Sequence, residues 1–186
     1  MKKQTTLILL LIFFGAFHLK AQKAILNENC HQAYKQIVCL QLDSADSLLT
    51  KELQLHNNAF VPYLRNYSDF VSLFVSQNKD LYEDLKSARI DNFSKVEELK
   101  ETSPYREWML GNMYLKWAVL KIMFGDYISA AIDFNRAYNL IEDNTEEHPD
   151  FQLNNLSVSV LKIIIGLIPE QYEWFLNLLS MEGDIE

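Results

Sequence analysis

The chain has 186 residues, of which 25 are acidic and 17 basic, and its formal net charge is −8 at pH 7. This acidic balance argues against nucleic-acid binding, because the phosphates of DNA and RNA are bound by basic residues. With only 5 glycines, the chain also has little material for the glycine-rich loops that hold phosphates and dinucleotides.

The first 21 residues have the form of a secretion signal. Lys2 and Lys3 precede an apolar run at 7–17, and residues 19–21 offer a small-residue cleavage site before Gln22. The run of about 11 residues is shorter than the roughly 20 that a membrane-spanning helix needs. We therefore expect an exported bacterial protein, periplasmic or secreted, that does not span a membrane after cleavage.

Residues 22–186 are expected to form one helical domain. Cleavage removes three lysines and no acidic residue, so the net charge falls from −8 to about −11. Apolar residues recur at spacings of three and four and predict helices arranged as four hairpins. The expected helices lie at 24–42, 45–55, 62–75, 79–100, 104–124, 127–141, 151–167 and from Pro169 onward. The helix at 79–100 is amphipathic and is expected to be interrupted near 91–92.

The two cysteines are expected to remain free thiols. Cys30 and Cys39 are nine residues apart in the predicted helix 24–42. Nine residues rise about 13.5 Å along a helix, whereas the Cα atoms of a disulfide lie within about 7 Å of each other. Cys30 shares an apolar stripe with Leu26 and Ile37, so its thiol is expected to be buried.

The helix at 104–124 is apolar on almost every side. After Glu107, its polar residues are Asn112, Lys116 and Lys121. A helix without a polar face is buried on all sides, so this one is expected at the centre of the fold.

The central helix is followed by a tight turn and a second helix. Gly125 supplies the permissive backbone for the turn, and Asp126 is a suitable N-cap. The second helix then carries a stripe of small and aromatic residues: Ala130, Ala131, Phe134, Ala137, Tyr138 and Ile141.

This region resembles a tetratricopeptide repeat, whose pattern is Trp-x₂-Leu-Gly-x₂-Tyr, then Ala-x₃-Phe and a closing Pro. The match covers one repeat, residues 111–144, and the closing proline is absent. The other predicted hairpins resemble the family only in shape. The packing positions of the repeat fall on Tyr114, Trp117, Ala118, Gly125, Ala130, Phe134 and Ala137, with Lys121 in place of the family's tyrosine.

The resemblance implies an all-α fold in which antiparallel helical hairpins stack as a short solenoid. In this family the first helix of each repeat lines a concave groove that binds peptides or helices. The corresponding groove positions here are Asn112, Leu115, Val119, Ile122 and Met123. Four of these five are apolar, so the groove is expected to bind an apolar segment or to be covered by another part of the assembly.

No catalytic motif is present, and we expect no enzymatic activity, cofactor or metal. His31, His56 and His148 are widely separated and lack the spacing of a zinc helix. The acidic residues at 146–150 are interpreted as a solvated turn. The 9 tyrosines and 3 tryptophans could form a sugar-stacking platform, but their helical spacing favours core packing.

The leading hypothesis is an exported, non-catalytic scaffold that binds a protein or peptide partner. One alternative is the structural N-terminal segment of a longer repeat protein, covered by downstream repeats. Another is an accessory protein of glycan uptake, although the lipid-anchor cysteine usual there is missing. The last hairpin is strongly apolar, which predicts self-association or a covering partner at residues Leu156, Val160, Ile164, Tyr172, Phe175 and Leu179.

Overall fold

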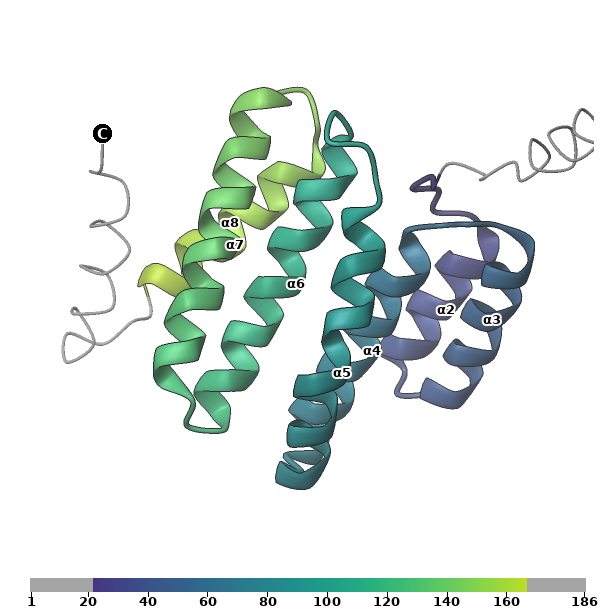
Figure 1. The fold of residues 1–186 in the computed structure, drawn as a ribbon, viewed down its shortest axis with the longest axis horizontal. Coiled ribbons are helices and arrows are strands. Elements are labelled where there is room, and N and C mark those ends of the chain that lie inside the picture. Colours follow the sequence, from purple (N-terminus) through teal and green to yellow (C-terminus); the bar gives the residue numbers. More distant parts are fainter. Residues whose placement is uncertain (1–21, 167–186) are drawn as a thin grey trace, which may run out of the picture.

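The computed structural model describes residues 22–166, and this part of the chain is all-helical, with seven helices and no strand (Figure 1). The predicted fold class is confirmed at this level. The expected signal at 1–21 and the helix from Pro169 onward lie outside the described residues. The helices are α2 (Glu28–Val38), α3 (Leu42–Leu55), α4 (Phe60–Ser76), α5 (Lys79–Glu97), α6 (Pro104–Met123), α7 (Tyr127–Glu147) and α8 (Leu153–Gly166).

Each helix packs against its neighbour in sequence and, in several cases, against the helix two places along. Thus α2 contacts α3 and α4, α4 contacts α5 and α6, and α6 contacts α7 and α8. The helices follow one another across the molecule, from α2 and α3 at one end to α7 and α8 at the other (Figure 1). None of the helices within residues 22–166 is long and apolar enough to cross a membrane.

Helix α6 occupies the centre, as predicted, and contacts α4, α5, α7 and α8. Its first turn begins at Pro104, whose missing N–H is not needed there. The prediction that this helix is buried on every side is wrong for its last turn, because Ile122 and Met123 are 45% and 37% exposed.

The turn between α6 and α7 lies at Gly125, where the sequence predicts it. Gly125 has a φ of +81°, a conformation that glycine adopts without strain. Its N–H donates to the carbonyl of Ile122, and the N–H of Asp126 donates to the carbonyl of Lys121. These two hydrogen bonds form a Schellman motif, which satisfies the last carbonyls of α6. The Asp126 carboxylate contacts Nζ of Lys86 on α5 at 2.8 Å instead of capping α7.

Small residues allow α6 and α7 to approach closely. Ala118 and Ala137 have no exposed surface, and Phe134 is 1% exposed. Gly111 also packs closely against α7, because an added Cβ would lie 2.7 Å from Cγ1 of Ile141. This glycine lies two turns before Ala118, where the tetratricopeptide match places its glycine position.

The N-terminal helix is shorter than the predicted 24–42. Helix α2 begins at Glu28, because the side chain of Asn27 caps it by accepting from the N–H of Cys30 at 3.1 Å. Leu26 therefore precedes the helix and is 57% exposed, not part of the buried stripe. The cysteine prediction is confirmed: Cys30 is buried, Cys39 is exposed, and both are free. The predicted interruption near 91–92 is wrong, since α5 is continuous there.

Candidate functional site

A groove with a volume of about 380 Å³ runs across four helices that alternate along the chain. Its lining residues come from α2, α4, α6 and α8, and each of these helices contacts the next one in this series. We call this site the aromatic groove. It is lined by Tyr34, Tyr63, Tyr67, Phe70, Trp108, Asn112, Leu115, Lys116, Val119, Leu156, Ser157, Val160 and Ile164.

The aromatic side chains of the groove form what we call its wall, and they contact one another in two groups. The rings of Tyr34 and Tyr67 are stacked, with centroids 5.7 Å apart, and Tyr67 stacks in turn on Phe70 at 6.3 Å. Tyr63 contacts Trp108 at 5.2 Å. Such ring pairs hold one another in fixed orientations, so the wall is a preformed surface against which an apolar group can pack.

Lys116 supplies the positive charge of the groove. Its Nζ atom lies 5.2 Å and 5.4 Å from the ring centroids of Tyr63 and Tyr67, and it donates to the carbonyl of Asn112 at 3.2 Å. No carboxylate is among the lining residues. Burial without a compensating negative charge lowers the pKa of Lys116 to about 8.

Asn112 and Ser157 fix α6 against α8 at the base of the groove. Nδ2 of Asn112 donates to Oγ of Ser157 at 2.9 Å and to the carbonyl of Trp108 at 2.7 Å. Nε1 of Trp108 donates to the carbonyl of Leu153 at 3.2 Å. Both amide protons of Asn112 are therefore engaged within the protein, and Lys116 remains as the charged donor of the groove.

We expect the Lys116→Met variant to be more stable than the wild type at pH 7, by about 1–3 kcal/mol. A lysine whose folded pKa lies below its unfolded value destabilises the fold wherever it must be protonated. That penalty is complete below about pH 8, shrinks as the pH rises, and vanishes above the ordinary value of 10.5. Urea denaturation at pH 7 and above pH 10 measures the difference. A stability difference between Lys116→Met and wild type that widens with rising pH would contradict the lowered pKa of Lys116.

Three of the five predicted groove residues, Asn112, Leu115 and Val119, line the aromatic groove. Ile122 and Met123 lie further along α6, exposed on its last turn and outside the lining residues.

The predicted repeat-packing positions have mostly buried side chains. Trp117, Ala118, Ala130, Phe134 and Ala137 are at most 1% exposed. Tyr114 is partly buried, and its ring lies 4.6 Å from that of Phe93 on α5. Gly125 forms the turn.

Sequence reasoning missed the aromatic residues of the groove by assigning them to the core. Trp117 and Tyr82 are buried as expected, at 0% and 2% exposure. Tyr34, in contrast, is 45% exposed, and Tyr63 and Tyr67 are partly buried along the groove. The four-residue spacing of Tyr63 and Tyr67 places them on one helix face, but only contact with α2 and α6 makes that face part of a groove.

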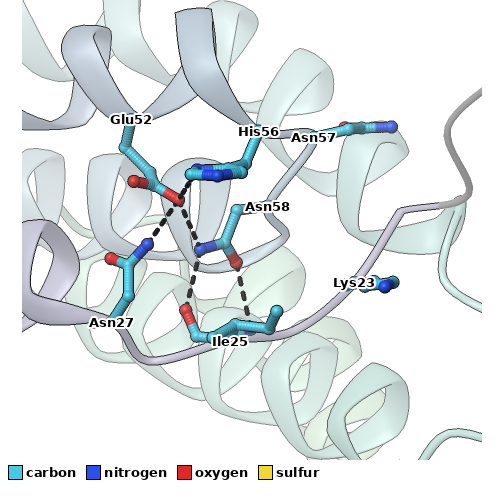
Figure 2. Close-up of a pocket in the computed structure, with 7 residues that line it drawn as sticks. All are labelled: Lys23, Ile25, Asn27, Glu52, His56, Asn57 and Asn58. Carbon is cyan, nitrogen blue, oxygen red and sulfur yellow. Dashed lines mark hydrogen bonds and ion pairs between the residues drawn. The ribbon is translucent and has the colours of Figure 1, made fainter.

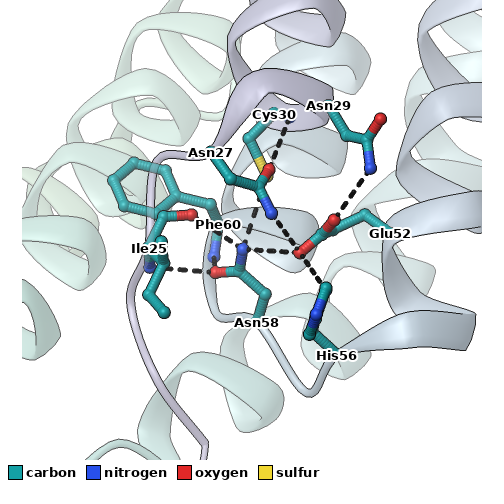
Figure 3. A network of polar contacts seen from close by, with 8 residues as sticks. All are labelled: Ile25, Asn27, Asn29, Cys30, Glu52, His56, Asn58 and Phe60. Carbon is teal, nitrogen blue, oxygen red and sulfur yellow. Dashed lines mark hydrogen bonds and ion pairs between the residues drawn. The ribbon is translucent and has the colours of Figure 1, made fainter.

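A second cavity of about 670 Å³ lies between the N-terminal segment and the end of α3 (Figure 2). It is lined by Lys23, Ile25, Asn27, Glu52, His56, Asn57 and Asn58. Glu52 has no exposed surface. Its carboxylate accepts from Nδ2 of Asn27 at 2.7 Å and from Nδ2 of both Asn29 and Asn58 at 3.0 Å, and Nδ1 of His56 lies 3.1 Å away (Figure 3).

This network holds the extended N-terminal segment against the helices. The N–H of Ile25 donates to Oδ1 of Asn58 at 3.1 Å, and Nδ2 of Asn58 donates back to the carbonyl of Ile25 at 2.7 Å (Figure 3). Burial opposes ionisation of Glu52, but hydrogen bonds from Asn58, Asn29 and Asn27 hold its pKa below the usual range. Because its oxygens already accept hydrogen bonds from three asparagines, this carboxylate has a structural role and is not available as a base.

The thiol of Cys30 is poorly placed for chemistry. Cys30 is fully buried, and burial raises the pKa of its thiol to about 12, so it is not a thiolate at neutral pH. Within residues 22–166, no group of three or more His, Cys, Asp or Glu side chains could hold a metal ion. The aromatic groove, with its unmatched positive charge, is the stronger candidate site.

Comparison with known proteins identifies no relative: no protein-family model, curated protein or solved structure matches the chain.

Proposed function

We propose that the protein is an exported, non-catalytic interaction scaffold of tetratricopeptide-like helical pairs, which binds an extended peptide segment in the aromatic groove. The observation that carries the proposal is the origin of the lining residues, which come from α2, α4, α6 and α8. In tetratricopeptide proteins, the corresponding first helices of successive repeats line the peptide-binding surface.

The composition of the groove also supports this function. Ligand sites combine an apolar and aromatic surface with a few placed polar groups, and the aromatic groove has five rings together with Asn112, Lys116 and Ser157. The aromatic side chains are held by contacts with one another, which limits the conformational entropy lost on binding. A peptide backbone with one or two apolar side chains suits such a surface.

The experiment is a selection from a displayed random-peptide library on the immobilised mature protein, followed by affinity measurements on the leading peptides. We expect Val119→Asp to lower the affinity by about tenfold or more, because it places a charge in the apolar groove. Fluorescence anisotropy with labelled synthetic peptides measures the change, and circular dichroism checks that the variant is folded.

The matched control is Ile128→Asp, an equivalent change at a residue of α7 that is 74% exposed and outside the groove. This variant should bind the peptides like the wild type. Equal losses for both variants would contradict the proposed site. Binding of oligosaccharides that is lost in Val119→Asp, with no peptide selected, would support the glycan-uptake alternative.

Exposed apolar residues on α8 favour a second candidate, in which further polypeptide covers this helix. Leu156 and Ile163 are 64% and 61% exposed, and Val160 is 37% exposed. Contiguous apolar surface of this kind is common at interfaces. Downstream repeats of the chain or a second copy would cover this surface. Three further residues expected on it, Tyr172, Phe175 and Leu179, lie outside the described residues.

A further inference from the structure

We infer that the aromatic groove selects segments that carry a carboxylate, with the ammonium group of Lys116 as its partner. The inference rests on the proposed peptide-binding function and adds the chemical class of the ligand. A side-chain carboxylate and the carboxylate at a chain end would both provide this chemistry.

Lys116 has hydrogen-bonding capacity that the described residues do not use. A lysine ammonium has three N–H donors. One of them is used by the carbonyl of Asn112, and the described residues supply no hydrogen-bond acceptor for the other two. The rings of Tyr63 and Tyr67 stabilise a cation through their faces but accept no conventional hydrogen bond.

Other cations held between helices have a carboxylate partner, which Lys116 lacks among the residues of the groove. Lys121 and Arg89 both contact the carboxylate of Asp133 at 2.7 Å, and Lys86 contacts that of Asp126 at 2.8 Å. In each case a carboxylate from a neighbouring helix or turn offsets the desolvation of the cation. The walls of the aromatic groove supply none to Lys116, and an incoming carboxylate would fill that role.

The groove would make an ion pair with Lys116 both strong and selective. Ion pairs gain strength where water is excluded, and the aromatic wall beside Lys116 would exclude water once an apolar side chain packs against it. The chain as a whole is acidic, with a net charge of −8. Its wider surface therefore repels acidic peptides, so any preference for them has to arise at a local cation.

The test repeats the peptide selection with wild type and Lys116→Met in parallel. We expect wild-type selections to be enriched in peptides with an acidic residue at a fixed distance from an apolar one. The Lys116→Met selections should keep the apolar preference and lose the acidic one. Replacing the selected Asp or Glu by Asn or Gln in a synthetic peptide should weaken binding to wild type by about tenfold, and should leave binding to Lys116→Met unchanged.

Two further variants sharpen the result. Lys116→Arg keeps the charge and should keep the acidic preference. Lys51→Met removes an exposed lysine of α3 outside the groove and should select the same peptides as wild type. Amidation of the peptide C-terminus separates the two carboxylate sources, because only a chain-end carboxylate is lost by it.

Apolar peptides enriched without any acidic preference would overturn this inference and leave the proposed function standing. An acidic preference that persists in Lys116→Met would also overturn it. A selection that enriches no peptide at all would overturn the proposed function together with the inference.

Discussion

Replacing Asp133 with alanine is expected to lower the free energy of unfolding by about 3–5 kcal/mol. Asp133 is 2% exposed on α7, and its Oδ2 atom contacts Arg89 of α5 and Lys121 of α6, both at 2.7 Å. The alanine variant removes this carboxylate from Lys121, which is itself 3% exposed. Burial already lowers the pKa of Lys121, although Asp133 opposes the shift. Urea denaturation at pH 7 measures the loss.

The control is Asp91→Ala, which breaks a pair with Lys95 on the surface of α5. Asp91 is 69% exposed, and exposed pairs contribute less than about 1 kcal/mol. A double variant, Asp133→Leu with Lys121→Met, should recover most of the lost stability, because it removes the buried cation as well as its partner. Equal losses for Asp133→Ala and Asp91→Ala would show that the buried contact does not connect the three helices.

Ala130→Arg is expected to destabilise the protein by about 3 kcal/mol or more, or to prevent folding. Ala130 has no exposed surface on α7. An arginine there adds several heavy atoms to a closely packed contact and brings a charge that has no partner. Thermal unfolding followed by circular dichroism measures the effect.

The control for Ala130→Arg needs an exposed position on the same helix. Asn135 reads from the sequence as a surface residue, but the structure leaves it only 8% exposed, so it does not serve. Asn139 is exposed on α7, and Asn139→Arg should leave the melting temperature nearly unchanged. Equal melting temperatures for Ala130→Arg and Asn139→Arg would contradict the packing of α7 described above.

The polar contacts around Glu52 and around Lys116 indicate different roles. Around Glu52, side chains from the N-terminal segment, α2 and the loop after α3 satisfy the carboxylate, and the result is a fixed structural contact. Around Lys116, the protein supplies rings and one carbonyl but no negative charge. Stability alone does not require such a cation in that place, and this is why the groove carries the functional proposal.

The amino-acid sequence by itself determined the helical class and the centre of the fold. Spacings of three and four residues record which face of a helix is apolar, so the burial of Ala130, Phe134 and Ala137 could be predicted. The turn at Gly125 was equally readable, because a tight reversal after an apolar helix needs a residue that tolerates positive φ. These features depend on neighbours a few positions apart.

Tertiary structure alone decided which polar groups are buried and where the groove lies. Glu52 follows Lys51 in a polar stretch and reads as solvent-exposed, yet it is buried because asparagines from two other segments meet its oxygens. The aromatic residues could be assigned to helices but not to a common surface, since α2, α4, α6 and α8 are separated by intervening helices along the chain. Helical periodicity describes one face of one element. Which faces meet depends on the packing of residues far apart in the sequence, and no local pattern encodes that packing.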